Sequence, residues 1–301
     1  MRKPAQPLVP LAALVAAALA LAACDVTIGA SEYSVREEKT FTVTGQARLA
    51  LSTFDGSIAV RGWDRNEVVV EVEKVGPDQQ TVERIKVKAA QDGNGITIDV
   101  PKPSPLETTG MRRTPSANLV VSVPLTCSIV ARSGDGSIEI RRVSGTFDVD
   151  TADGSIQLED IAGSLVARTG DGSVRGRKVD GEAEIHTGDG TVGLDGVLTG
   201  VTIETRDGSI EVTARPGSRA GREWGLTTGD GHVSLEVPKG FSADVDARTG
   251  DGRVRIDSIT DASGATAGDE GQRDSVTAKL GDGGRPLRIR TSSGSITVKL
   301  W

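Results

Sequence analysis

The stretch Ser133-Gly-Asp-Gly-Ser137 indicates the architecture of the chain, because close copies of it follow at a fixed spacing. The copies are Thr151-Ala-Asp-Gly-Ser155, Thr169-Gly-Asp-Gly-Ser173, Thr187-Gly-Asp-Gly-Thr191 and Thr205-Arg-Asp-Gly-Ser209. Their aspartates, Asp135, Asp153, Asp171, Asp189 and Asp207, are each 18 residues apart, and looser copies follow at Asp230 and Asp251. A fixed period of this length indicates one small structural unit that is stacked many times.

Each unit contains two stretches with the alternation of a β-strand. Counted from the aspartate, the residues at offsets +3 and +5 are apolar in most copies, and so are those at +12 and +14. The first pairs are Ile138 and Ile140, Ile156 and Leu158, Val192 and Leu194, and Ile210 and Val212; the second are Phe147 and Val149, Leu165 and Ala167, Ala183 and Ile185, and Val201 and Ile203. Period-two alternation predicts two short strands per unit. Glycines at offset +10, Gly145, Gly163 and Gly181, indicate a second corner.

Two architectures fit this pattern: an antiparallel meander of Asp-Gly hairpins, and a solenoid in which each unit is one coil. Charged residues at equal offsets separate them. Offset +6 reads Arg141, Glu159, Arg177, Asp195; offset +7 reads Arg142, Asp160, Lys178, Gly196; offset +15 reads Asp150, Arg168, His186, Glu204. Alternating charges stabilise only if equal offsets are neighbours about 4.8 Å apart, as in a parallel stack. We therefore predict an all-β parallel β-solenoid, a single-stranded, right-handed β-helix with about 18–23 residues per coil.

The chain divides into a leader, a tether and one solenoid domain. We expect a lipoprotein signal peptide over residues 1–23, a polar tether over 24–40 and the solenoid over 41–301. Within the solenoid we expect an irregular N-terminal part (41–124) with a Pro-rich loop (101–117), regular repeats (125–260), a flexible insertion (261–275) and C-terminal strands (276–301). A short N-terminal helix is predicted between Pro77 and Arg84.

The leader predicts a membrane anchor. Arg2 and Lys3 precede an apolar run over residues 8–21, which is too short to span a bilayer comfortably. The ending Leu21-Ala-Ala-Cys24 resembles the lipobox of bacterial lipoproteins, in which the cysteine is lipidated and becomes the mature N-terminus. We therefore expect lipidation of Cys24 and a place in the cell envelope, on the outer side of the cytoplasmic membrane or in the periplasm. An ordinary secretory signal with an incidental cysteine is the alternative.

Composition limits the classes of partner and core. A net charge of -7 without a basic stripe argues against nucleic-acid binding. Aromatic residues make up 3 % of the chain and glycines number 38, which suits stacked turns with small β-branched side chains. With Cys24 lipidated, Cys127 has no disulfide partner and is predicted to be a small buried hydrophobic residue.

Several separate phrases resemble one family. They are Gly62-Trp-Asp-Arg-Asn-Glu-Val-Val-Val70, the Gly-Asp-Gly-Ser-Ile repeats, Val237-Pro-Lys-Gly-Phe-Ser-Ala-Asp-Val245 and Leu287-Arg-Ile-Arg-Thr-Ser-Ser-Gly-Ser-Ile296. Together they are similar to the DUF4097 family, described as candidate adhesins. The resemblance implies a β-helix-like fold and an envelope location, and it brings no defined activity or functional residues. A role as an accessory to envelope-stress signalling follows only from where some relatives are thought to act.

The aspartates are the residues most suggestive of chemistry, because their row is acidic throughout. Two carboxylates about 4.8 Å apart repel by roughly 1 kcal/mol in water. The favoured interpretation is that each aspartate caps its own turn by accepting a backbone N–H while glycine takes positive φ. The alternative is a ladder of Ca²⁺ ions, for which the weak candidates are Asp135, Asp153, Asp171, Asp189 and Asp207.

No catalytic residue and no cofactor are predicted. His186 and His232 fall at outward offsets of the repeat and are expected to be surface residues. We predict a non-enzymatic, lipid-anchored envelope protein that acts as a structural or adhesin-like interaction scaffold. The expected partners are the membrane, through Cys24, and an envelope protein or polysaccharide. The alternative is a carbohydrate-active β-helix enzyme of glycosidase or lyase type, which would show carboxylates in a groove flanked by aromatic side chains.

Overall fold

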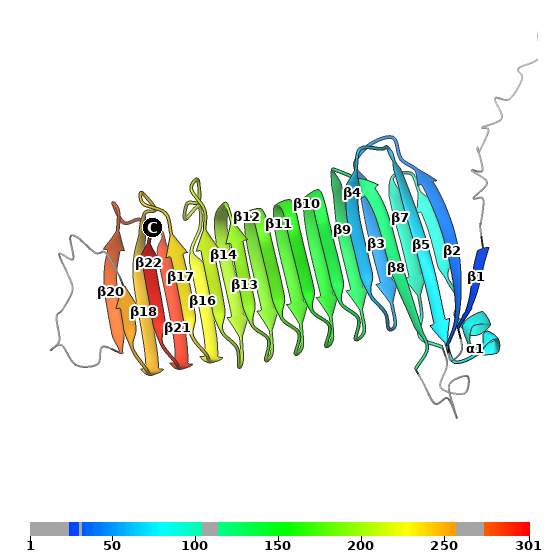
Figure 1. Ribbon diagram of the computed structural model, residues 1–301. Helices are drawn as coiled ribbons and strands as arrows, with labels where there is room; N and C mark the ends of the chain where they lie inside the picture. The colour runs from blue at the N-terminus through cyan, green and yellow to red at the C-terminus, as the bar shows by residue number, and fades with distance from the viewer. Residues whose placement is uncertain (1–23, 30–31, 104–113, 257–273) are drawn as a thin grey trace, which may run out of the picture.

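The strands of the protein lie side by side in one elongated stack (Figure 1). The structure, a computed structural model, describes residues 24–29, 32–103, 114–256 and 274–301. The predicted signal peptide, most of the Pro-rich loop and most of the insertion at 261–275 lie outside these ranges. The first strands and the helix α1 occupy one end of the stack, and β18 and β20 occupy the other.

The regular coils form a parallel, in-register stack. Their strands are β9 (Cys127–Ser133), β10 (Ile138–Thr151), β11 (Ile156–Thr169), β12 (Val174–Thr187), β13 (Val192–Gly196), β14 (Leu198–Thr205) and β15 (Ile210–Ala214). Ile138 pairs with Ile156 and Ile156 pairs with Val174, so residues at equal offsets of successive units are neighbours. The predicted all-β parallel solenoid is therefore confirmed, and the meander is wrong.

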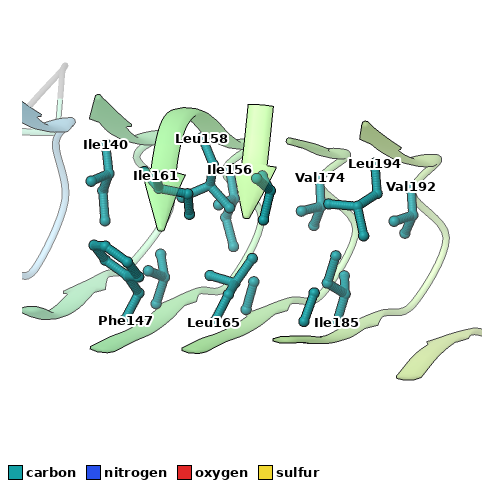
Figure 2. Close-up of a cluster of buried hydrophobic side chains, with 14 of the residues drawn as sticks. Ile140, Phe147, Ile156, Leu158, Ile161, Leu165, Val174, Ile185, Val192 and Leu194 are labelled. Atoms are coloured by element: carbon teal, nitrogen blue, oxygen red, sulfur yellow. The ribbon is translucent and has the colours of Figure 1, made fainter. Parts of the chain in front are cut away.

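The two apolar rows of each coil face one another across a thin core. Figure 2 shows Ile140, Leu158 and Leu194 on one side and Phe147, Leu165 and Ile185 on the other, all directed inward. All six side chains are buried. Small and β-branched residues suffice because the two strand layers lie close together, which explains the low aromatic content.

The second corner lies within β10, β11 and β12, where the chain turns although each strand continues through it. Arg142, Asp160 and Lys178, at offset +7, have φ of 58°, 57° and 52°. Glycines at offset +10, Gly145, Gly163 and Gly181, have φ of 153°, 129° and 131°. These left-handed residues bend each coil while the buried residue between them, such as Val143, keeps facing the core.

The N-terminal end is closed by antiparallel strands and a short helix. Its elements are β1 (Cys24–Gly29), β2 (Glu32–Thr42), β3 (Ala47–Thr53), β4 (Ile58–Trp63), β5 (Glu67–Gly76), α1 (Gln79–Arg84), β6 (Lys88–Asp92), β7 (Gly95–Val100) and β8 (Ser116–Pro124). Strands β1, β2, β5 and β8 continue one face of the solenoid as an antiparallel sheet. The predicted helix is confirmed, and Asp78 caps it by accepting a hydrogen bond from the Thr81 backbone N–H at 2.7 Å.

The predicted tether over residues 24–40 differs from the structure, which places residues 24–29 in β1 and residues 32–40 in β2. Strand β2 pairs along its length with β5. The alternation of apolar and polar residues that predicts a strand is interrupted in β2, because Glu37 occupies a position where an apolar residue is expected. The Glu37 carboxylate forms an ion pair with Lys74, whose side chain is only 10 % exposed. That pairing offsets the cost of placing a charge at the edge of the core.

The coils at both ends do not follow one another in sequence order. The coil of β3 and β4 lies between the β7–β8 coil and the β9–β10 coil. At the other end the strands are β16 (Trp224–Asp230), β17 (Val233–Val237), β18 (Ala243–Asp251), β19 (Val254–Ile256), β20 (Ser275–Leu280), β21 (Pro286–Ser293) and β22 (Ile296–Leu300). Here the last coil in the sequence, β21–β22, lies between the β16–β17 and β18–β19 coils. The C-terminal coil is therefore internal to the stack.

Candidate functional site

A buried column of hydroxyl groups runs along the Asp-Gly corner. Thr151 Oγ1 donates to the carbonyl oxygen of either Gly134 or Gly136 on the preceding coil, each at 2.9 Å. The hydroxyls also accept within their own turns, as in Gly172 N to Thr169 Oγ1 at 3.2 Å. The members of this hydroxyl column, all buried, are Thr53, Ser133, Thr151, Thr169, Thr187, Thr205, Thr228, Thr249 and Thr291. Each hydroxyl thus links one turn to its neighbour.

The glycine after each aspartate is required by close stacking. A Cβ at Gly172 would lie 2.0 Å from the carbonyl oxygen of Gly154, and a Cβ at Gly190 would lie 2.0 Å from that of Gly172. The expectation that these glycines take positive φ is wrong for the regular run, where the positive-φ glycines lie at the other corner. Neighbouring turns approach so closely that only hydrogen fits between them.

The aspartates point outward into solvent, beside the hydroxyl column. Among the described residues, the side chains of Asp135, Asp153 and Asp171 accept no hydrogen bond, so the expectation that each aspartate caps its turn is wrong. The hydroxyl column makes the capping contact instead. The row begins at Asp55, and Ser293 lies between Asp230 and Asp251 because the C-terminal coil is inserted there. Calcium binding by the row stays untested, and the described residues contain no cluster of three or more metal-ligating side chains.

At Asp55, the first member of the row, burial and charge repulsion act in the same direction. Burial, and next the charge of Asp135, raise the pKa of the Asp55 carboxyl above its usual value. A raised folded-state pKa means that the ionised form destabilises the fold at pH values above it. We expect Asp55→Asn to raise the melting temperature at pH 7, and the gain to shrink as the pH falls through the folded-state pKa. Asp64→Asn, outside the row, is the control; an unchanged melting temperature for Asp55→Asn at pH 7 would contradict the repulsion.

The alternating charges form inter-coil ion pairs. Glu159 lies 3.5 Å from Arg141 Nε on one side and 3.6 Å from Arg177 Nη2 on the other. In the offset +15 row, His186 lies 3.3 Å from Glu204 and also 3.1 Å from Glu184. The predicted ladders are confirmed in part, by the contacts of Glu159 at offset +6 and of Glu204 at offset +15. At offset +7 no ion pair joins the described residues Arg142, Asp160 and Lys178. Exposed pairs of this kind each contribute about 0–1 kcal/mol, so they favour the register more than they add to stability.

The charged face carries one broad depression of about 610 Å³. Its floor lies at Gly193, which has no side chain, and its walls include Arg175 and Glu211. Glu159 and Asp195 also line it, and both lie in ion pairs with arginines. No aromatic residue is among those that line it. The depression therefore lacks the rings on which sugars stack in carbohydrate-active enzymes.

The two histidines lie on different rows and are not brought together with a nucleophile in a closed site. His186 is half-buried in its ion-pair ladder. His232 is exposed in the turn before β17, and its Nδ1 accepts from the Ser295 backbone N–H at 3.3 Å. The Ser295 hydroxyl lies 3.1 Å from the same nitrogen. This contact joins the inserted C-terminal coil to the coil of β16 and β17.

Cys127 is fully buried at the start of β9, as predicted. Burial raises the pKa of its thiol to about 12, so almost no thiolate exists at neutral pH. We expect a thiol-reactive reagent at pH 8 to leave Cys127 unlabelled in the native protein and to label it after unfolding in guanidinium chloride. Labelling is measured as the increase in intact mass. The experiment uses the Cys24→Ser variant, in which Cys127 is the only thiol of the sequence. Rapid labelling of the native chain would contradict this.

Cys24 opens β1, whose pairing sets it opposite Glu37. Strand β1 is the outermost strand of its face, so Cys24 lies at the N-terminal end of the stack (Figure 1). No helix within the described ranges is long and apolar enough to cross a membrane.

Stacked parallel coils with paired surface charges place the chain in the class of parallel β-solenoid proteins. The profile described as Toastrack DUF4097 matches residues 25–299, and the chain belongs to the DUF4097 family. No curated protein matches it significantly.

Solved structures with similar folds come from several bacteria. A candidate cell adhesion protein from Clostridium sporogenes matches 88% of this chain and 100% of its own, at 13% identity and a TM-score of 0.29. A candidate adhesin from Bacteroides fragilis matches 88% and 97%, at 11% identity and 0.42. A candidate lipid-binding protein from Parabacteroides distasonis matches 88% and 96%, at 10% identity and 0.42.

Sequence reasoning missed the hydroxyl column. The signal was present, because a threonine or serine begins every copy of the repeated phrase. The charged aspartate is the more conspicuous residue of the phrase, although the hydroxyl residue recurs as regularly. A residue type repeated two positions before the aspartate in every coil could have been assigned to the core by the same period-two argument that assigned its neighbours.

Proposed function

We propose that the protein is a non-enzymatic interaction scaffold, held at the cell envelope by a lipid on Cys24. The observation that carries the proposal is that carboxylates on the strands of the regular coils, such as Asp148 and Glu159, pair with arginines on neighbouring coils. Arg168, for example, contacts Asp148 at 3.1 Å and Glu184 at 4.0 Å. Such pairing stabilises a long, flat, polar surface, which suits contact with another large molecule.

The place of Cys24 supports the same proposal. Three acyl chains on this residue would supply more than the two signals that stable anchoring needs. Because Cys24 lies at one end of an elongated stack, the anchor holds one end of the solenoid at the bilayer while its sides stay accessible. The adhesin and lipid-binding descriptions given to the similar structures agree with a binding role at the envelope.

Photo-crosslinking in intact cells tests the scaffold. A photoreactive residue is placed in turn at Gln157, Arg175 and Glu211, which are exposed at equivalent positions on one face of the stack. We expect at least one position to yield a discrete product with an envelope protein or polysaccharide, identified by mass spectrometry. The same positions in a Cys24→Ser chain are the matched control and are expected to lose the product. Absence of products at all three positions would contradict the scaffold.

The carbohydrate-active enzyme is tested separately. Glu159 and Asp195 are two of the carboxylates that line the depression, and in an enzyme they would serve as acid and base. Purified protein is incubated with isolated envelope polysaccharide, and new reducing ends or unsaturated sugars are measured. We expect neither; release of products that Glu159→Gln abolishes would replace the scaffold with an enzyme.

A further inference from the structure

A small pocket lies at the second corner of the N-terminal part, where three connections of the chain meet. The connections run from β2 to β3, from β4 to β5 and from β8 to β9, and they line a cavity of about 290 Å³. They meet because the β3–β4 coil is inserted between two others. The residues that shape the cavity are Gln46, Trp63, Asp64, Asn66, Leu125 and Thr126.

The indole of Trp63 is held in a fixed position at this pocket. Its Nε1 donates to the Glu67 carbonyl oxygen at 2.9 Å, and the Arg65 guanidinium carbon lies 4.7 Å from the ring centroid. Arg65 is itself paired with the Glu67 carboxylate at 3.2 Å. Nearby, Leu125 is 41% exposed, one of few large apolar side chains that face solvent. The pocket thus combines a rigid aromatic ring with an apolar contact.

Polar groups in the pocket remain available to a ligand. Within the described ranges, the Asp64 carboxylate and the Asn66 side-chain amide make no hydrogen bond to protein. Gln46 uses only its Nε2, toward Ser128 Oγ at 3.5 Å, which leaves its carbonyl oxygen unused. A carboxylate and two amides can together accept and donate several hydrogen bonds at once.

The chemistry of these groups selects a ligand class. An anionic ligand is disfavoured because Asp64 is negative and Arg65 is paired with Glu67. A lipid chain is disfavoured because most of the lining is polar. A ligand with several hydroxyl groups and an apolar ring face would satisfy the carboxylate and amides and contact the indole. We propose that this pocket binds one ring of a neutral saccharide, an inference that rests on the scaffold function and names its ligand.

Binding is tested on the full-length protein with two kinds of probe. Saturation-transfer NMR uses methyl glucoside, methyl galactoside and N-acetylglucosamine at millimolar concentrations, the range expected for a ligand of so few atoms. Isolated envelope polysaccharide is tested separately for retention on immobilised protein, which distinguishes free sugars from the polymer. Trp301→Ala is the matched control, because Trp301 also lies near an arginine, Arg215, but at the other end of the stack.

We expect at least one probe to bind, Trp63→Ala and Asp64→Ala each to lower its binding at least about fivefold, and Trp301→Ala to leave it unchanged. Asp64 is exposed and makes no protein contact that folding needs, so its variant decides the question if Trp63→Ala unfolds. The proposal is overturned if no probe binds, or if Asp64→Ala binds as tightly as the wild type. Crosslinked partners without saccharide binding would overturn only this inference and leave the scaffold standing.

Discussion

Removing residues 286–301 is expected to unfold the C-terminal third of the solenoid, although it deletes only the last strands of the chain. Strands β21 and β22 lie between two other coils, so their loss exposes buried surfaces on both sides. Leu287, Ile289, Ile296 and Val298 are all fully buried. Four such side chains contribute on the order of 6–12 kcal/mol in apolar burial, comparable to the whole stability of an ordinary domain. Trp224, which pairs with Leu287, would also lose its neighbour.

Hydrogen exchange measures this effect strand by strand. We expect the amides of β16 and β18 to lose protection in the truncated chain, while β10 and β11 keep theirs, since contacts in a solenoid are local. Deletion of residues 24–31 is the control, because β1 is a true edge strand with one partner. A synthetic peptide of residues 286–301 should restore part of the protection. Full protection of β18 in the truncated chain would contradict the inserted position of the C-terminal coil.

Gly172→Ala is expected to destabilise the protein by about 1–3 kcal/mol or more, an unusually large effect for adding one methyl group at a turn. The new Cβ would lie 2.0 Å from the Gly154 carbonyl oxygen, which belongs to backbone and has no rotamer to adopt. The two turns would have to separate. The hydrogen bond from Thr169 Oγ1 to Gly154 O at 2.9 Å would be strained at the same place.

Denaturant unfolding of a matched pair measures this cost. Gly193→Ala is the control, because no atom lies within 4 Å of a Cβ at Gly193, on an outward position of β13. We expect that substitution to be neutral or to stabilise by about 0.5–1 kcal/mol, the usual gain of alanine over glycine in a strand. If both variants unfold at the wild-type denaturant concentration, close stacking is not the reason for glycine at this corner.

The stacking of the regular coils was predictable because each position recurs at the same offset. Residues at equal offsets are neighbours in the stack, as the pairing of Ile138 with Ile156 shows. The opposite charges of Arg141 and Glu159 fit the same arrangement. The order of the end coils could not be predicted in this way, because their order in the stack differs from their order in the sequence. The Leu287–Ile296 phrase resembles the other copies closely enough to stack on any of them, and nothing in it specifies which gap it fills.

The proposed pocket was not predicted from the sequence. Trp63 is one of three tryptophans and lies within the phrase Gly62–Val70 that resembles the DUF4097 family. Gln46 and Leu125 reach it only because an inserted coil brings three distant connections to one corner. Strand β2 was not predicted because Glu37 interrupts its apolar pattern. Its charge is tolerated there because it pairs with Lys74, a residue 37 positions away. Both misses come from long-range contacts that no local pattern encodes.

Anchoring of the protein through Cys24 is tested by the fraction of the cell in which the protein is found. Membranes are washed with high salt, which removes proteins held by surface charge alone. We expect the wild-type protein to remain in the membrane pellet and the Cys24→Ser protein to appear in the soluble envelope fraction. A Cys24→Ser protein that stays in the washed membranes would contradict lipid anchoring at this residue.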